Sequence, residues 1–387
     1  MGAPQLGILE RWALRYLEKR FRKSPTAAGD DDVHVLNESE RQRLRRIEQG
    51  VVLRAALIGA VTAAFAAGVE VLCTPWLLGP DPEAATWEMQ AKFWAVVGPL
   101  IGVAAVIEIA LLYWDSLRSV YSLSDAAGLR LFGQGPQTRT TALALARAAL
   151  ELPNPQTAEG IDAHREVSKV WLVTVGLLYK LKVGLTSFLL KALVRRAAGR
   201  AAVRAWLVWV AVPVTALWDA ITAWRIVREA RLRAMGPSAA HELASALFED
   251  RPPLSEGARV AALQAVGGSI VSTHDMHPNL LALLRAVEGH LGDSAGYVLD
   301  DTKRFLEQLD SLDPKERLRA LEVLAVSAII DGRVTRTERE LVADAQTRCG
   351  RQGLGGLRYL RRRFLAGQPL TLHDVQRAIG VPITSTR

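Results

Sequence analysis

The stretches AALIGAVTAAFAAGVEVLCTPWLL (residues 55–78) and FWAVVGPLIGVAAVIEIALLYW (residues 93–114) decide the fold that we expect of this chain. They contain 24 and 22 residues, and a helix needs about 20 predominantly apolar residues to cross a bilayer. At the end of the first run and just after it, Pro75, Pro80 and Pro82 mark a turn, because proline lacks the N–H that continues a helix. We therefore expect a transmembrane hairpin of two helices.

The composition also indicates a membrane. The mean hydropathy is +0.12, which is high for a wholly soluble protein, and the net charge is +8. The basic residues crowd beside the apolar runs, where anionic headgroups attract them, so we expect membrane lipid and not nucleic acid as a partner. Cys73 and Cys349 are too few for a disulfide framework or a cysteine metal site, which fits a bacterial inner membrane with reduced cytosolic domains.

Charge asymmetry orients the hairpin. Basic residues precede or open the first run, and the connection between the runs is acidic. The basic residues are Arg41, Arg43, Arg45, Arg46 and Arg54, and the acidic ones are Asp81, Glu83 and Glu88. Because cytoplasmic flanks carry the excess of lysine and arginine, we expect both ends of the hairpin, and both chain termini, in the cytoplasm.

Each apolar run carries one acidic residue, Glu70 in the first and Glu108 in the second. Ionisable groups within a span are functional candidates by default. If the helices fold back about a midpoint near Ala84, Glu70 lies toward the outer interface and Glu108 toward the inner one. Each then reaches headgroups, and the two cannot share a proton. We therefore favour a structural or interfacial role over a proton relay.

Residues 170–194 and 205–224 form a second apolar pair, but Lys180 interrupts the first of them. The turn between them is basic, and the positive-inside rule opposes placing it outside. We favour a cytoplasmic or membrane-surface hairpin. The alternative is two further spans, in which Lys180 lies level with Asp219 and pairs with it. The basic residues expected to face lipid headgroups are Arg195, Arg196, Arg200 and Arg204.

The second pair carries a Val212-Pro213-Val214 step and a Trp218-Asp219-Ala220 stretch, and a basic segment follows it. The basic residues of that segment are Arg225, Arg228, Arg231 and Arg233. This arrangement resembles the EcsC-like group of bacterial membrane-associated proteins. The resemblance implies membrane association and brings no known catalytic residues.

From residue 237 onward the pattern predicts soluble helices, the first over residues 239–248. The chain contains no P-loop, HExxH or GxSxG motif and no histidine or cysteine cluster, so we expect no enzyme. His274 and His277 are the one close histidine pair. With no third ligand evident, we interpret them as a surface turn before Pro278 and not as part of a metal site.

Residues 325–338, AVSAIIDGRVTRTE, carry a distinctive turn pattern. Gly332 can adopt the positive φ that ends a helix, and Thr335 with Glu338 can form a capping box on the next one. This motif resembles the TerB-like domain of tellurite-resistance proteins. The resemblance implies an all-helical module of stress-response and membrane-linked assemblies, in which acidic residues are associated with a divalent metal. Here it touches only Asp331 and Glu338, and two carboxylates are too few for a closed calcium site.

We therefore predict an all-α protein with a transmembrane helical hairpin, a membrane-associated or transmembrane hairpin and a cytoplasmic TerB-like domain. The expected segments are residues 1–50 (amphipathic helix and linker), 51–115 (transmembrane hairpin), 116–168 (helical connector), 169–236 (second hairpin), 237–312 (soluble helices) and 313–387 (TerB-like domain).

The function that fits these segments is a non-enzymatic scaffold or stress-response component of the bacterial inner membrane. It needs no cofactor and presents its helical domain to an unknown protein partner. The alternative is a small ion or solute conduit that uses four intramembrane charges, namely Glu70, Glu108, Lys180 and Asp219. Gly98 and Gly102 match the small-xxx-small spacing of closely packed spans, which leaves a homo-oligomer as a further option.

Overall fold

The computed structural model describes residues 7–23, 35–80, 82, 84–126, 136–155, 157–165, 201–294, 296–351 and 355–381. In these residues it contains twelve helices and one antiparallel ribbon of two short strands, so the chain is mostly helical as predicted.

The elements of the first half of the chain are α1 (Ile8–Lys23), α2 (Glu38–Leu77), α3 (Trp87–Ala126), α4 (Pro136–Ala149), β1 (Thr157–Ala158) and β2 (Ile161–Asp162). Those of the second half are α6 (Ala201–Phe248), α7 (Glu256–Thr273), α8 (Pro278–Leu291), α9 (Thr302–Ser311), α10 (Pro314–Ile330), α11 (Arg336–Arg348), α12 (Gly355–Leu365) and α13 (Leu372–Ala378).

The chain divides into two compact units. The apolar unit comprises Arg45–Val120 and Ser168–Arg228, and the helical unit comprises Met1–Leu44, Tyr121–Val167 and Glu229–Arg387. The helical unit therefore includes most of the segment expected to be a separate connector. Helix α6 belongs to both units, since it continues from one into the other without a break.

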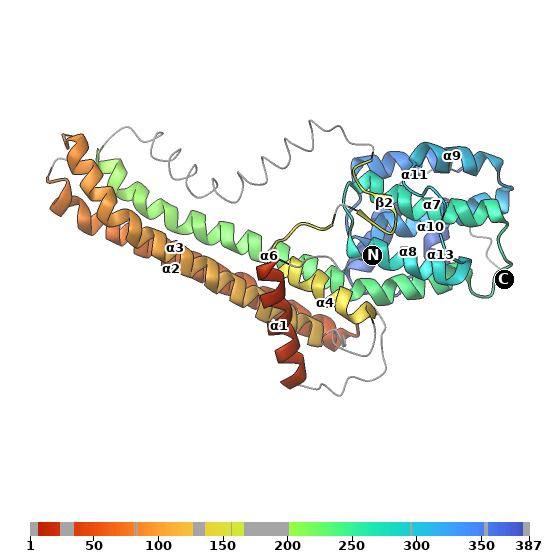
Figure 1. Cartoon of the computed structure of the whole chain (residues 1–387), viewed down its shortest axis with the longest axis horizontal. Helices are drawn as coiled ribbons and strands as arrows, with labels where there is room; N and C mark the ends of the chain where they lie inside the picture. The colour runs from red at the N-terminus through yellow and green to blue at the C-terminus, as the bar shows by residue number, and fades with distance from the viewer. Residues whose placement is uncertain are drawn as a thin grey trace. The chain divides into compact units, whose positions relative to one another are not determined.

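In the apolar unit, α2 and α3 form the predicted antiparallel hairpin (Figure 1). Near its open end, Arg54 Nε donates to Asp115 Oδ1 at 2.7 Å and Arg54 Nη2 donates to Ser119 Oγ at 3.2 Å. These bonds fix the register of the two helices. Pro75 lies inside α2 and is not part of the turn, and Pro99 lies inside α3.

Helix α6 packs against α2. A Cβ added to Gly59 of α2 would lie 2.2 Å from Asp219 Oδ2 and 3.2 Å from the Thr215 carbonyl oxygen of α6, so glycine is needed for this close approach. Three described helices, α2, α3 and α6, are long and apolar enough to cross a membrane. From the basic turn of the second apolar pair we had favoured a cytoplasmic or membrane-surface hairpin there, whereas α6 is one of these three candidate spans.

The apolar unit leaves large hydrophobic side chains uncovered. Those that are 60% or more exposed are Leu53, Val61, Leu72, Trp76, Trp87, Val103, Val106 and Leu217. In the described part of the helical unit, by contrast, the most exposed large hydrophobic side chain is Leu9, at 48%. Broad apolar exposure on long helices is the surface expected of a protein that meets lipid.

The core of the helical unit is built around α7 and α10. Every residue from Arg319 to Ile330 is buried, so this part of α10 is enclosed on all sides. Its one buried acid within this stretch, Glu322, accepts hydrogen bonds from Arg251 at 2.6 Å and from Gln376 at 2.8 Å. Side-chain caps define where the helices begin, including Ser255 before α7 and Asp313 before α10.

The segments that precede α6 are tied into the same unit. Arg147 of α4 pairs with Glu10 of α1 at 2.7 Å. The loop after α4 reaches α8 and its flank, because Asn154 donates to Asp275 at 2.7 Å and Arg285 pairs with Glu159 at 2.6 Å. These contacts keep α1, α4 and the C-terminal helices together.

We expected a break before residue 239, but α6 runs through Pro237 to Phe248. A proline inside a helix removes one backbone hydrogen bond. The helix continues because its last turns are buried: Ala239, Leu243 and Leu247 all lie in the core of the helical unit. Packing of this apolar face outweighs the local cost of the proline.

Candidate functional site: the polar cluster at the α10–α11 turn

The turn between α10 and α11 has the predicted local structure. Gly332 has φ +73°, and a Cβ there would lie 2.6 Å from Leu232 Cδ1 of α6. The Arg333 N–H donates to Asp331 Oδ1 at 2.8 Å, which closes the turn. Thr335 and Glu338 form the reciprocal capping box at the start of α11. The sequence pattern thus predicted this geometry correctly.

Both acids of the motif are buried, with Asp331 at 2% and Glu338 at 1% exposure. Glu338 Oε2 accepts the Thr335 N–H at 2.9 Å, whereas Glu338 Oε1 has no hydrogen-bond partner among the described residues. Burial raises the pKa of Asp331 to about 6. Burial, together with the charge of Asp331, raises the pKa of Glu338 above its usual range. Burial therefore makes ionisation of both carboxyl groups less favourable than it is in water.

Next to this pair, Glu229 of α6 collects three basic or N–H groups. Glu229 Oε1 lies 3.0 Å from Arg233 Nε and 3.0 Å from His277 Nε2, and Glu229 Oε2 lies 3.3 Å from Arg333 Nη2. Burial works to raise the pKa of Glu229. The hydrogen bond from His277 and the charges of Arg233 and Arg333 outweigh it, so the pKa lies well below its usual range. Glu229 is the anionic centre of the cluster.

His277 is fully buried, so its placement in a surface turn was wrong. Its Nδ1 accepts the Asn279 N–H at 3.2 Å as the N-cap of α8. Because Nδ1 is an acceptor, the ring proton lies on Nε2 and is donated to Glu229. Pro278 at the first turn of α8 turns the histidine inward as a cap, a role that the spacing of the two histidines does not reveal.

Asn279 links three helices. Its Nδ2 donates to the Leu232 carbonyl of α6 at 2.9 Å and to the Ile330 carbonyl of α10 at 2.8 Å. Gly236 of α6 allows this approach, because a Cβ there would lie 2.0 Å from Asn279 Oδ1. The cluster therefore joins residues 229–236 of α6 to α8 and α10 through buried polar contacts.

The cluster does not fit the metal site that the TerB-like resemblance implies. Among the described residues, no group of three or more His, Cys, Asp or Glu side chains is placed to hold a metal ion. Asp331 and Glu338 supply two carboxylates, and Glu338 already caps α11. The arrangement instead connects helices, with a charged centre at Glu229 and two buried acids beside it.

The structure brings together two of the four predicted intramembrane charges, Glu108 of α3 and Asp219 of α6. The two acidic groups lie close enough for their charges to interact. Asp219 is 7% exposed, and its Oδ2 has no hydrogen-bond partner in the described part of the chain. Glu108 therefore does not face headgroups alone, as we had expected. The prediction considered only the antiparallel folding of the two apolar runs, which relates Glu108 to Glu70. It did not consider α6.

The other predicted site residues contribute less. Glu70 lies on α2, partly exposed. Lys180, Arg195, Arg196 and Arg200 lie outside the described residues, and for Arg204 only its backbone position in α6 is described.

Sequence reasoning missed Glu229. A signal was present, because Glu229 is the one acid within the basic segment that follows the apolar part of α6. A single acid among arginines is a candidate for a shared ion pair.

Comparison with protein-family models, with curated proteins and with solved structures finds no match to this chain.

Proposed function

We propose that this protein is a non-enzymatic, multi-pass scaffold of the bacterial inner membrane. In this proposal both termini are cytoplasmic, and the helical unit is presented to a protein partner, in line with the TerB-like and EcsC-like resemblances and their link to stress responses. The observation that carries the proposal is helix α6. Its residues up to Arg228 belong to the apolar unit, and its last turns belong to the core of the helical unit.

Hydrogen bonds and close contacts hold α6 in place within the helical unit. Arg233 is 5% exposed and donates to the Ala144 carbonyl at 2.6 Å as well as to Glu229. Three residues further along α6, Gly236 packs closely against Asn279 of α8. These groups hold α6 to α4 and α8. Among these described contacts no nucleophile lies beside a base, which supports a structural role over catalysis.

The chain path also constrains topology. Residues 136–165 contact the C-terminal helices, so both lie on one side of the membrane. The number of crossings between residues 165 and 229 is then even, either none or two. With the α2–α3 hairpin, the protein has two or four spans in all.

Cysteine labelling tests the anchoring and the orientation. After replacement of Cys73 and Cys349, single cysteines are introduced as Ala84→Cys, Gly289→Cys and Ala198→Cys. Ala84 is exposed in the α2–α3 turn, and a side chain at Gly289 meets nothing within 4 Å. An impermeant reagent on intact cells should label position 84 and should reach position 289 only after lysis. Labelling at position 289 in intact cells would refute the cytoplasmic placement.

A photo-crosslinking residue at Tyr359 tests the scaffold role itself, because this side chain is 41% exposed on the helical unit. A discrete crosslinked protein in living cells supports the proposal. The same crosslinker at exposed Gly289 provides a matched control on another face. The absence of any adduct at both positions argues against presentation of this unit to a partner.

A second candidate function, an ion or solute conduit, is supported by the Glu108–Asp219 pair. Two neighbouring acids within apolar helices are a feature of proton pathways. If the protein is a conduit, Ala198→Cys should be labelled from outside, which indicates four spans. The purified protein should also carry a proton flux in proteoliposomes. The flux should fall in Asp219→Asn and persist in Glu70→Gln. A flux that is absent from the unmodified protein removes this candidate.

A further inference from the structure

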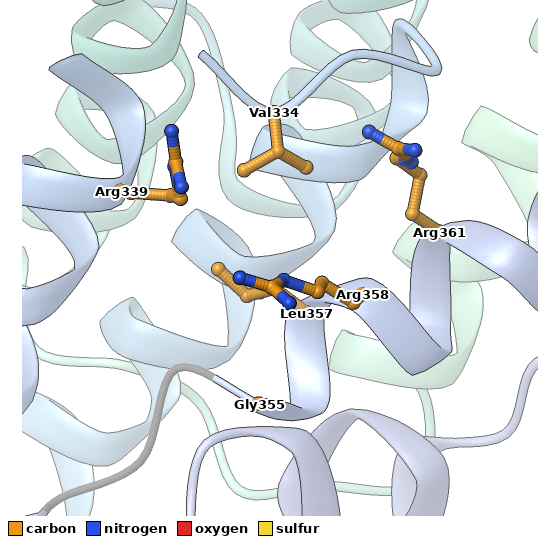
Figure 2. A pocket seen from close by; sticks show the side chains of 6 residues that line it. All are labelled: Val334, Arg339, Gly355, Leu357, Arg358 and Arg361. Carbon is orange, nitrogen blue, oxygen red and sulfur yellow. The ribbon is translucent and has the colours of Figure 1, made fainter. Parts of the chain in front are cut away.

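A hollow lies on the outer side of the α10–α11 turn, where α11 faces α12. It has a volume of about 440 Å³ and is shown in Figure 2. We call it the arginine pocket, and its lining residues are Val334, Arg339, Gly355, Leu357, Arg358 and Arg361. The side chains come from two separate stretches of the helical unit, so the pocket depends on the folded chain.

Three of the six lining side chains are cationic, and none is acidic. In Figure 2 Arg339, Arg358 and Arg361 surround the space below Val334. Within the described part of the chain, none of these three arginines forms a salt bridge. Nearby arginines differ, since Arg363 pairs with Asp374 at 2.7 Å. Three like charges around one hollow repel one another and create a positive potential that attracts an anion.

The pocket also has apolar walls. Leu357 is 1% exposed and Val334 is partly buried against the core. Small-molecule sites are mostly apolar clefts of about 300–1,000 Å³ that contain a few convergent polar groups. The size and lining of the arginine pocket match this pattern. A solvated arginine surface would lack the apolar walls.

The α12 side of the pocket is held in place. A Cβ added to Gly356 would lie 2.2 Å from Ala378 Cα, so glycine lets the start of α12 pack directly on the end of α13. Gly355, the first residue of α12, lines the pocket. The first N–H groups of a helix lack partners within it and favour anions. The arginines therefore act together with a fixed helix start.

From these features we propose that the arginine pocket binds the phosphate group of a small organic ligand. Guanidinium groups form paired hydrogen bonds with phosphate oxygens, and Val334 with Leu357 would contact the ligand's apolar part. The site goes beyond the scaffold role and does not depend on it, because all of its residues lie in the helical unit. The phosphate could belong to a soluble ester or to a lipid headgroup.

The test uses the purified full-length chain in a non-ionic detergent with two probes. Calorimetric titration with pyrophosphate reports soluble phosphate binding, and native mass spectrometry with added phosphatidylglycerol reports headgroup binding. The variants Arg339→Gln and Arg358→Gln remove one cation from each wall. Arg362→Gln removes the same charge from an exposed position that does not line the pocket, so it controls for net charge.

We expect pyrophosphate to bind, and each pocket variant to weaken binding about tenfold, the usual effect of one lost charge-assisted hydrogen bond. Arg362→Gln should bind like the unmodified protein. If only phosphatidylglycerol binds, with the same pattern of variants, the pocket holds a lipid phosphate. The proposal is overturned if neither probe binds, or if all three variants weaken binding equally. The topology labelling described above is independent of both outcomes.

Discussion

Replacement of Glu229 by glutamine tests whether the Glu229 centre stabilises the helical unit. The amide keeps the shape of the side chain and removes its charge. Arg233, 5% exposed, then keeps only uncharged acceptors, among them the Ala144 carbonyl at 2.6 Å. Loss of one partner of a buried ion pair costs about 3–5 kcal/mol. Because Arg233 retains that carbonyl, we expect the lower end, about 3 kcal/mol.

Hydrogen–deuterium exchange of the full chain in detergent measures this effect locally in α8 and α10. A loss of about 3 kcal/mol speeds exchange roughly 100-fold for amides that exchange by opening of the unit. Glu340→Gln is the matched control, because it breaks an exposed pair with Arg336, a kind of contact worth at most about 0.5 kcal/mol. If α8 exchanges equally in both variants, Glu229 is not the centre that the geometry indicates.

The same comparison has a pH dependence of known sign. The folded-state pKa of Glu229 lies below its usual value of 4.5. Its contribution to stability is therefore complete above pH 4.5 and declines as the pH falls toward the folded-state pKa. The difference between the unmodified protein and Glu229→Gln should shrink in acid. A difference that grows in acid would contradict the assigned charge.

Four further changes test other parts of the structure. Asn279→Ala removes two buried amide hydrogen bonds, so α8 should lose about 2 kcal/mol in the exchange assay, while Gly236→Ala should destabilise the same contact by steric overlap. Because the pKa of Asp331 is raised from 3.8 to about 6, the unmodified unit should lose about 3 kcal/mol as the pH rises through this range, and thermal unfolding of Asp331→Asn should lack this loss. Val103→Lys places a charge on an exposed site of α3 and should cost about 3 kcal/mol of insertion, seen as less protein in the membrane fraction, whereas Gln90→Lys near the helix start should have little effect.

Local patterns predicted local structure well. The turn of positive φ at Gly332 and the capping box at Thr335 depend on residues within seven positions of one another, and both are present. The two apolar runs likewise predicted the long helices α2 and α3 and the turn between them. In each case the physical cause lies in neighbouring residues, through hydrogen bonds along one helix or the length of one hydrophobic segment.

Predictions failed where distant segments meet. His277 was assigned to a surface turn because no third metal ligand was evident and proline follows it, yet it is fully buried and contacts Glu229, 48 positions earlier. A separate helix was expected over residues 239–248, but core packing of these turns makes them a continuation of α6. Glu108 was expected to face headgroups at the inner interface, and α6 brings Asp219 close to it. Periodicity along one segment carries no information about which other helix packs on it.

The sequence by itself determined the helical class, the long apolar helices and the α10–α11 turn, because these follow from hydrophobic length, proline and glycine chemistry and short-range capping. Only the tertiary structure decided which polar groups share an environment. The Glu229 centre and the Glu108–Asp219 pair combine side chains from helices far apart in the chain, and the arginine pocket combines side chains of two successive helices. Their burial and charge depend on packing between helices, which no local pattern encodes.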